Sequence, residues 1–406
     1  MQSDKNPSRS GKKARKYYIL IILFFLLSLL SKSAAVVLPL VMLLVDYLVK
    51  RKWSFAVILE KIPFFMFSLL FGIIALYSQK SGIHTDIGLI LPFHERFFIL
   101  NYGFFRYLAM LFFPFGMSVL HPYPVPGDTG YATPVYLSVV FNLIIIGLVL
   151  FSMKHSRIYF FGFLFFIVTI ILVLQILPVG GAYISERYTY IPYIGLFYII
   201  ASVFHNLWQR ETGTGALKKL LLVLFVAFSA EFTWITYDRI RIWNNSEVMW
   251  TDAISKYPGR CQSYLFRGVL RNKNGNADGA LADFSSYIRL KTDNPVAYNE
   301  RGNIFFNRKK YNEALADYNV ALYLDSTMHE AYNNRGVIKG IKGDLNAAIA
   351  DFNKAIKLDS VYVHAFRNRG YAWMKMNNME AARRDWLKAA HLGDTVSMGY
   401  IKKYNK

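Results

Sequence analysis

Residues 297–322 read AYNERGNIFFNRKKYNEALADYNVAL, and the same pattern occurs four times at a spacing of 34 residues. Each copy contains a five-residue segment that starts with an aromatic residue and ends with an Arg-Gly pair. These segments are residues 264–268, 298–302, 332–336 and 366–370. An alanine follows each glycine twelve residues later, and then an acidic-aromatic pair: Ala280 with Asp283-Phe284, Ala314 with Asp317-Tyr318, Ala348 with Asp351-Phe352, and Ala382 with Asp385-Trp386. Small and aromatic residues at a fixed period predict stacked helical hairpins.

This period and these residues resemble the tetratricopeptide repeat, a pair of antiparallel helices. The resemblance predicts four repeats over residues 261–394. There are two departures: Tyr287 stands where the other repeats carry alanine, and the usual proline at the repeat end is replaced by Thr292, Ser326, Ser360 and Asp394.

Both ends of the array are predicted to be closed. In residues 238–260, Trp250 and Ala253 occupy the positions of an additional half-repeat, for which Ser246 is a plausible N-cap. Residues 395–406 are predicted to form the polar capping helix that such solenoids need at an open end.

The composition of the whole chain indicates a membrane protein. Of its 406 residues, 54% are hydrophobic and only 18% are charged, and the formal net charge is +21. An apolar, basic chain fits anionic lipid headgroups or basic cytoplasmic loops better than nucleic acid, which is not an expected partner. The single cysteine, Cys261, excludes an intramolecular disulfide and a thiolate metal cluster, and no metal site is predicted.

The first half of the chain contains the apolar runs. A basic cytoplasmic tail at 1–16 precedes a predicted transmembrane domain at 17–237. Seven runs have about the length that a bilayer requires, namely 17–30, 34–49, 62–77, 134–153, 158–176, 191–207 and 217–235. The fold class predicted from the sequence is therefore all-α, with about seven membrane spans followed by a tetratricopeptide α-solenoid.

An eighth apolar run, residues 97–115, is ambiguous because it contains Asn101, Arg106 and Pro114. If it does not cross, the basic residues between the other spans fall inside, as the positive-inside rule prefers. We therefore expect a re-entrant or interfacial helix. This topology places everything after residue 235 outside, in the periplasm of a bacterium or in the lumen of the endoplasmic reticulum of a eukaryote.

Polar loops on the outer face hold the candidate site of the membrane domain. A guanidinium matches phosphate geometry, so Arg187 could contact a lipid phosphate; the alternative is an interfacial ion pair with the adjacent Glu186 that anchors the helix end beside Tyr188. His121 and Tyr123 could position a ligand or simply form a proline-rich turn, and Arg96 could bind phosphate or reach toward headgroups.

Four stretches resemble a known family: LLSKSAAVVLPLVMLLVDY (29–47), LFFPFGMSVLHPYPVP (111–126), LPVGGAYISERYTYIPYIGL (177–196) and RIWNNSEVMWTDAISKYP (241–258). They are similar to polytopic proteins of the protein O-mannosyltransferase type, which have the membrane C-type glycosyltransferase fold and tetratricopeptide repeats. The resemblance implies sugar transfer from a polyprenyl-phosphate donor to a protein hydroxyl, with the repeats holding the acceptor. The lipid-linked sugar would be the only cofactor.

One feature of that family is missing. Its members carry a catalytic acidic residue in a first outer loop, ahead of the segment that matches Leu29, and this sequence has no counterpart to that loop. The catalytic residue is therefore unknown, and an upstream membrane segment is an expected partner. Four outer-face carboxylates remain as possible bases: Asp86, Glu95, Asp128 and Glu186. The alternative is a noncatalytic membrane scaffold that recruits a protein.

The repeats themselves predict a groove for a protein or peptide. Residues of the first helices should line it: Asn299, Asn303, Asn333, Val337, Arg367 and Tyr371. Asparagine both donates and accepts hydrogen bonds, so these side chains can pair with a peptide backbone without demanding a sequence. The alternative is that they are solvated residues of an array that spaces or oligomerises.

Overall fold

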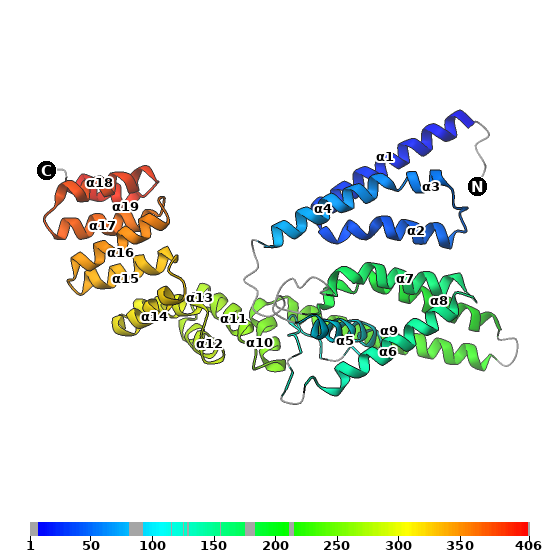
Figure 1. Ribbon diagram of the computed structural model, residues 1–406. Helices are drawn as coiled ribbons and strands as arrows, with labels where there is room; N and C mark the ends of the chain where they lie inside the picture. The colour runs from blue at the N-terminus through cyan, green and yellow to red at the C-terminus, as the bar shows by residue number, and fades with distance from the viewer. Residues whose placement is uncertain are drawn as a thin grey trace. The chain divides into compact units, whose positions relative to one another are not determined.

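The computed structural model describes residues 7–80, 92–114, 116–124, 126–127, 130–154, 156–174, 183–210 and 215–404. Within these residues the chain is helical, apart from the isolated bridges His121–Ile184 and Gly127–Gly130. It divides into two compact units, Met1–Arg239 and Ile240–Lys406 (Figure 1). The predicted all-α class is confirmed.

The first unit contains the apolar helices. In chain order they are α1 (Pro7–Ser31), η1 (Ser33–Val37), α2 (Leu38–Leu48), α3 (Phe55–Leu59), α4 (Ile62–Lys80), α5 (Phe93–Phe112), α6 (Thr133–Ser152), α7 (Arg157–Ile170), η2 (Ile171–Val173), η3 (Glu186–Tyr188), α8 (Pro192–Arg210) and α9 (Ala216–Trp243).

Three helices in the described part of this unit are long and apolar enough to cross a membrane: Phe55–Ser78, Thr133–Ser152 and Ala216–Trp243. They correspond to the predicted runs 62–77, 134–153 and 217–235. The prediction of seven spans is thereby corrected to three candidates. Since the number of crossings decides on which side of the membrane the second unit lies, its location outside remains a prediction.

The other four predicted runs differ from these in length or polarity. Ala34–Leu48 and Arg157–Val173 are shorter apolar helices that each include a 3-10 segment, and a bilayer core requires about 20 helical residues. The run 17–30 belongs to α1, which begins in the basic tail. The run 191–207 belongs to α8, whose last two turns carry polar residues. An apolar stretch in the sequence does not show where a helix tightens or becomes polar.

Helix α5, which covers most of the ambiguous run, lies at the centre of the larger apolar core of the first unit. Tyr107 is fully buried there, and its hydroxyl accepts a hydrogen bond from the Ser185 amide at 2.9 Å. Tyr193 on α8 in turn donates to the Tyr107 carbonyl at 2.7 Å. These bonds fix the segment around residue 185 against α5. The interfacial or re-entrant placement of α5 stays a prediction.

Helices α7 and α8 pack at a pair of glycines. A Cβ added to Gly162 would lie 2.4 Å from the Gly195 carbonyl oxygen, and one added to Gly195 would lie 2.2 Å from that of Gly162. Small residues allow the backbones of apolar helices to approach this closely. The crossing therefore depends on the absence of side chains at both positions.

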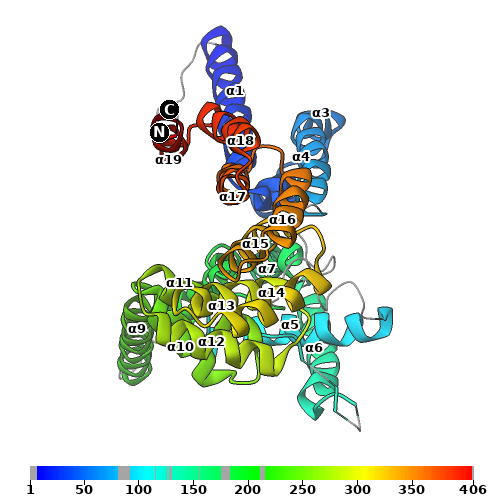
Figure 2. The same cartoon turned by 90° about the vertical axis from the view of Figure 1, so that its left-hand side faces the viewer.

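The second unit is a stack of helical hairpins (Figure 2). The first helices are α11 (Cys261–Lys273), α13 (Pro295–Asn307), α15 (His329–Ile341) and α17 (Val363–Lys375); the second helices are α12 (Ala277–Leu290), α14 (Tyr311–Leu324), α16 (Leu345–Leu358) and α18 (Met379–His391). Helix α10 (Ser246–Lys256) precedes them and α19 (Thr395–Lys403) follows. The N-cap of α10 is Asn245, not Ser246, because its Oδ1 accepts the amides of Glu247 and Val248.

Each hairpin closes over its glycine. A Cβ on Gly302 would lie 2.8 Å from the ring of Tyr318. In the other three repeats, a Cβ on the glycine would lie 2.6–2.9 Å from the aromatic side chain of the same repeat. The repeated glycine and aromatic residue in the sequence therefore correspond to a ring that packs directly on a helix backbone.

An arginine connects each hairpin to the preceding one. Arg301 donates through Nε and Nη2 to the two carboxylate oxygens of buried Asp317, at 2.8 and 2.7 Å, and through Nη1 to Ser285 on the preceding second helix. The same arrangement repeats at Arg267–Asp283 with Thr251, Arg335–Asp351 with Asn319, and Arg369–Asp385 with Asn353. Thr251 lies on α10, so α10 takes the place of a preceding second helix.

Candidate functional site

The first helices of the second unit carry a connected set of side-chain amides, which we call the amide network: Asn303, Asn333, Asn334 and Asn368. Asn368 donates to the Oδ1 of Asn333 at 2.9 Å, and Asn333 donates to Asn334 at 3.0 Å. Asn334 donates to Asn303 at 2.9 Å, and Asn303 also accepts the hydroxyl of Tyr318 at 2.8 Å. The network thus links three repeats, with every amide bond donated in the same direction.

The amide network does not use all the donor hydrogens of its asparagines. An amide nitrogen carries two hydrogens, and each donating asparagine uses one of them in the network. Asn333 is buried, but Asn334 and Asn368 are half-buried, so their remaining hydrogens can bind carbonyl oxygens of an extended chain. Two members, Asn334 and Asn368, were missed in the sequence; the signal was the asparagine directly before the Arg-Gly pair in the third and fourth repeats.

The structure places the six predicted groove residues in different surroundings. Asn299 and Asn333 are buried, and Asn303 is half-buried in the network. Val337 packs partly against the apolar cluster around Phe352, so it contributes to the core of the repeat.

The last two predicted groove residues lie on α17. Arg367 forms an ion pair with Asp394 at 3.0 Å and contacts the Nδ1 of His364 at 2.7 Å. Tyr371 is exposed over 44% of its surface. The fourth repeat therefore presents a compensated cation beside an accessible aromatic ring.

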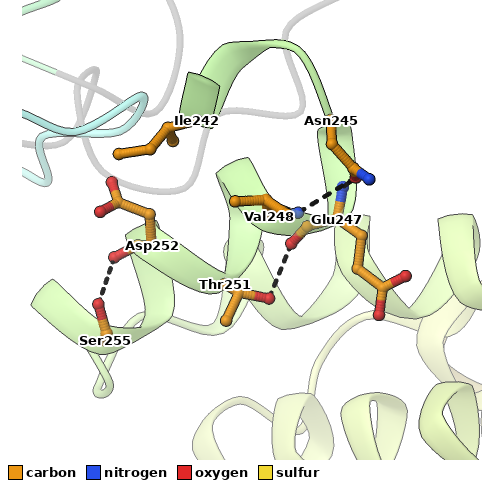
Figure 3. A pocket seen from close by; sticks show the side chains of 7 residues that line it. All are labelled: Ile242, Asn245, Glu247, Val248, Thr251, Asp252 and Ser255. Atoms are coloured by element: carbon orange, nitrogen blue, oxygen red, sulfur yellow. Dashed lines mark hydrogen bonds between the residues drawn. The ribbon is translucent and has the colours of Figure 1, made fainter. Parts of the chain in front are cut away.

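A cleft of about 440 Å³ lies elsewhere on the second unit, between the end of α9 and α10 (Figure 3). Its lining residues are Ile242, Asn245, Glu247, Val248, Thr251, Asp252 and Ser255. The hydroxyls of Thr251 and Ser255 donate to backbone carbonyls of α10 itself, and Asn245 caps this helix. Because these polar groups serve the helix, the amide network is the stronger candidate for a binding site.

In the first unit, Glu186 belongs to a buried polar cluster. Its carboxylate lies 3.2 Å from Arg239 Nη2 and 3.3 Å from His121 Nε2. The side chains of Glu186 and Arg239 are each only 10% exposed. A carboxylate compensated in this way holds the η3 segment, the loop after α5 and helix α9 together, and it is poorly suited to act as a general base.

Arg187 is exposed. Its guanidinium lies 5.3 Å from the centre of the Tyr188 ring. Lys32, which follows α1, lies 5.7 Å from the same ring and 5.4 Å from that of Tyr190. Two cations from distant parts of the chain thus flank one tyrosine. The sequence suggested an ion pair between Glu186 and Arg187, but each has a different partner.

The other predicted residues of the outer loops are spread around this unit. Tyr123 is buried, which raises its pKa to about 12, and the charge of Arg96 opposes this rise. Glu95 accepts the hydroxyl of buried Tyr131 at 2.7 Å. Asp86 and Asp128 lie outside the described residues. Among the described residues no three His, Cys, Asp or Glu side chains gather as a metal site would require.

Comparison with protein families identifies the repeats. A family model described as TPR repeat matches residues 302–340, and one described as Tetratricopeptide repeat matches residues 329–362. The second unit contains tetratricopeptide repeats. We therefore call it the TPR unit. Neither matching model describes a glycosyltransferase, so the resemblance of the first unit to O-mannosyltransferases has no support from these matches.

Solved structures of repeat proteins are also similar to the chain. MamA from Desulfovibrio magneticus RS-1 is 16% identical with a TM-score of 0.35, covering 40% of this chain and 93% of that one. YrrB, described as a TPR protein with an unusual peptide-binding site, is 17% identical with a TM-score of 0.35, covering 49% and 97%. The first TPR of Spaghetti (RPAP3), bound to an HSP90 peptide, is 22% identical with a TM-score of 0.28, covering 29% and 93%. None of the curated proteins compared with the chain matches it.

Proposed function

We propose that this chain is a membrane-anchored scaffold whose TPR unit binds an extended segment of a partner protein. The observation that carries the proposal is the amide network, which gives the first helices a row of hydrogen-bonding groups directed along the array. An extended peptide presents carbonyl and amide groups at regular intervals, and side-chain amides can pair with both. Helices long enough to cross a bilayer provide the anchor.

The test uses the full chain in lipid nanodiscs and a library of fluorescent nonapeptides with random sequences. We expect binding by the wild-type chain and a loss of about tenfold in affinity for Asn334→Ala, because one hydrogen bond with its desolvated partner accounts for about 1–1.5 kcal/mol. Asn312→Ala is the matched control, since Asn312 is exposed on the second helix α14. Equal affinities of the two variants would contradict the proposal.

A second candidate function is sugar transfer from a polyprenyl-phosphate donor. The observation that favours it is the pair of cations, Lys32 and Arg187, that flank Tyr188 on the surface of the first unit. A lipid phosphate bound between them would be held by charge and by guanidinium hydrogen bonds. The base for such a reaction is still missing, because Glu186 is compensated by Arg239.

This second function is tested by incubating the chain with a polyprenyl-phosphate hexose and an acceptor protein. Transfer that is lost in Arg187→Ala and kept in Arg210→Ala would favour it, because Arg210 lies at the far end of α8. Transfer at the same rate in both variants would remove Arg187 from the site.

A further inference from the structure

Glu300 interrupts the amide network at the second repeat. It occupies the position on α13 that Asn334 occupies on α15 and Asn368 on α17, directly before the arginine of each repeat. Both asparagines donate to the preceding repeat, whereas a carboxylate can only accept. Glu300 accepts instead from Asn272 of the first repeat, at 3.4 Å. The second repeat therefore presents an acceptor where the third and fourth repeats present donors.

The charge of Glu300 has no cationic partner among the residues that the structure describes. Each of the four buried aspartates of the repeats is paired with an arginine: Asp283, Asp317, Asp351 and Asp385. Glu300 is half-buried, and the charge that acts on it is that of another carboxylate, Glu330, which itself lies 3.5 Å from His329 Nε2. Burial and the charge of Glu330 raise the pKa of Glu300. A cation beside this carboxylate would relieve an unfavourable interaction.

The residue before Glu300 in the chain, Asn299, has an acceptor without a hydrogen-bond partner. The Oδ1 of Asn299 is buried and receives no hydrogen bond, and only 7% of the residue is exposed. Its equivalent in the third repeat, Asn333, accepts from Asn368 at 2.9 Å. A buried acceptor without a donor is unfavourable, so this oxygen indicates a donor that a ligand would supply.

Arg367, the cation of the fourth repeat, gives no corresponding reason to expect an acidic side chain in the ligand. Arg367 of the fourth repeat is already paired with Asp394. The charge of Arg367 is therefore compensated and that of Glu300 is not, although the chain as a whole carries a net charge of +21. This contrast favours a ligand with a basic side chain over an acidic one.

We propose that Glu300 and Glu330, with the amide oxygen of Asn299, form a subsite for an arginine or lysine side chain of the bound peptide. The inference rests on the peptide binding proposed above and adds the chemistry of one ligand position. Arginine fits better than lysine, because its guanidinium has five donors in a planar fork and can serve a carboxylate and a carbonyl together.

The test uses the full chain in nanodiscs and three fluorescent nonapeptide libraries. The flanking positions are random, and the central residue is arginine, citrulline or glutamate. Citrulline keeps the shape of arginine without its charge. We expect the arginine library to bind about tenfold more tightly than the citrulline library, as a charge-assisted hydrogen bond predicts. In Glu300→Gln this preference should disappear, while the control Glu313→Gln, which changes an exposed carboxylate on α14, should keep it.

The outcomes separate the two proposals. If the wild-type chain binds none of the libraries, the proposed function is wrong. If it binds the arginine and citrulline libraries equally, peptide binding stands and the subsite is wrong. The folding of Glu300→Gln is checked by the rate at which an alkylating reagent modifies Cys261, which is buried in the first repeat.

Discussion

Replacing Asp283 by alanine tests whether the repeated ion pairs hold the TPR unit together. Asp283 is buried and accepts three hydrogen bonds: from Arg267 Nε at 3.0 Å, from Arg267 Nη2 at 2.7 Å and from Arg271 Nη1 at 3.0 Å. In Asp283→Ala both guanidiniums lose the Asp283 carboxylate while staying largely buried. We therefore expect the local unfolding equilibrium of the first repeat to shift strongly toward the open state.

The magnitude follows from what the two arginines retain. Breaking a buried pair by removing one partner costs about 3–5 kcal/mol. Arg267 keeps its bond to Thr251, and Arg271 keeps its ion pair with Glu247 at 2.7 Å. Their side chains are 12% and 19% exposed, so water compensates part of the loss. The lower end, about 3 kcal/mol, is the expected cost, equivalent to a change of about a hundredfold in the opening equilibrium.

The assay is the alkylation rate of Cys261, the single cysteine of the chain, measured on the full-length protein. This side chain packs with Tyr287 and Ala297, so its reaction reports opening of the first repeat. Asp278→Ala is the control: it removes an exposed carboxylate of the same helix, whose surface ion pair is worth at most about 1 kcal/mol. Alkylation rates within twofold of each other in the two variants would refute the reasoning.

Two further predictions concern packing and pH. Gly162→Ala should destabilise the first unit by about 3 kcal/mol or more, because the new Cβ meets a backbone oxygen of α8, whereas Gly147→Ala, with no atom within 4 Å, should melt like the wild type. Burial opposes ionisation of Asp394, but bonds from Ser397 and the charge of Arg367 lower its pKa. Its stabilisation is complete above the unfolded pKa of about 3.9 and is lost as pH falls through the folded value, so Asp394→Asn should flatten acid denaturation monitored by far-ultraviolet circular dichroism.

The repeats could be predicted because their signal is periodic and local. A glycine under a ring and an arginine sixteen residues before its aspartate recur at a fixed spacing, and each records a contact within one hairpin. The membrane spans could be predicted only in part. Hydropathy shows which stretches are apolar, but the tightening of the chain into 3-10 turns beside α2 and α7 depends on packing.

The candidate sites depended on contacts between distant residues, which the sequence does not display. Glu186 and Arg187 are adjacent, yet their partners are Arg239 and Tyr188, and Lys32 approaches the same ring from the start of the chain. Adjacent residues point in different directions along a 3-10 or α-helical turn, so adjacency was a poor guide to pairing.

The amide network explains why a charged position would decide which peptide binds. Its asparagines are bonded to one another in the absence of a ligand, so a peptide backbone exchanges one set of neutral hydrogen bonds for another, with a small net gain. Such binding tolerates many sequences. Glu300 differs because its charge has no cationic partner among the described residues, so an incoming guanidinium can add an ion pair beside the hydrogen bond from Asn272. Selectivity would therefore reside at the second repeat, while the third and fourth repeats would hold the backbone.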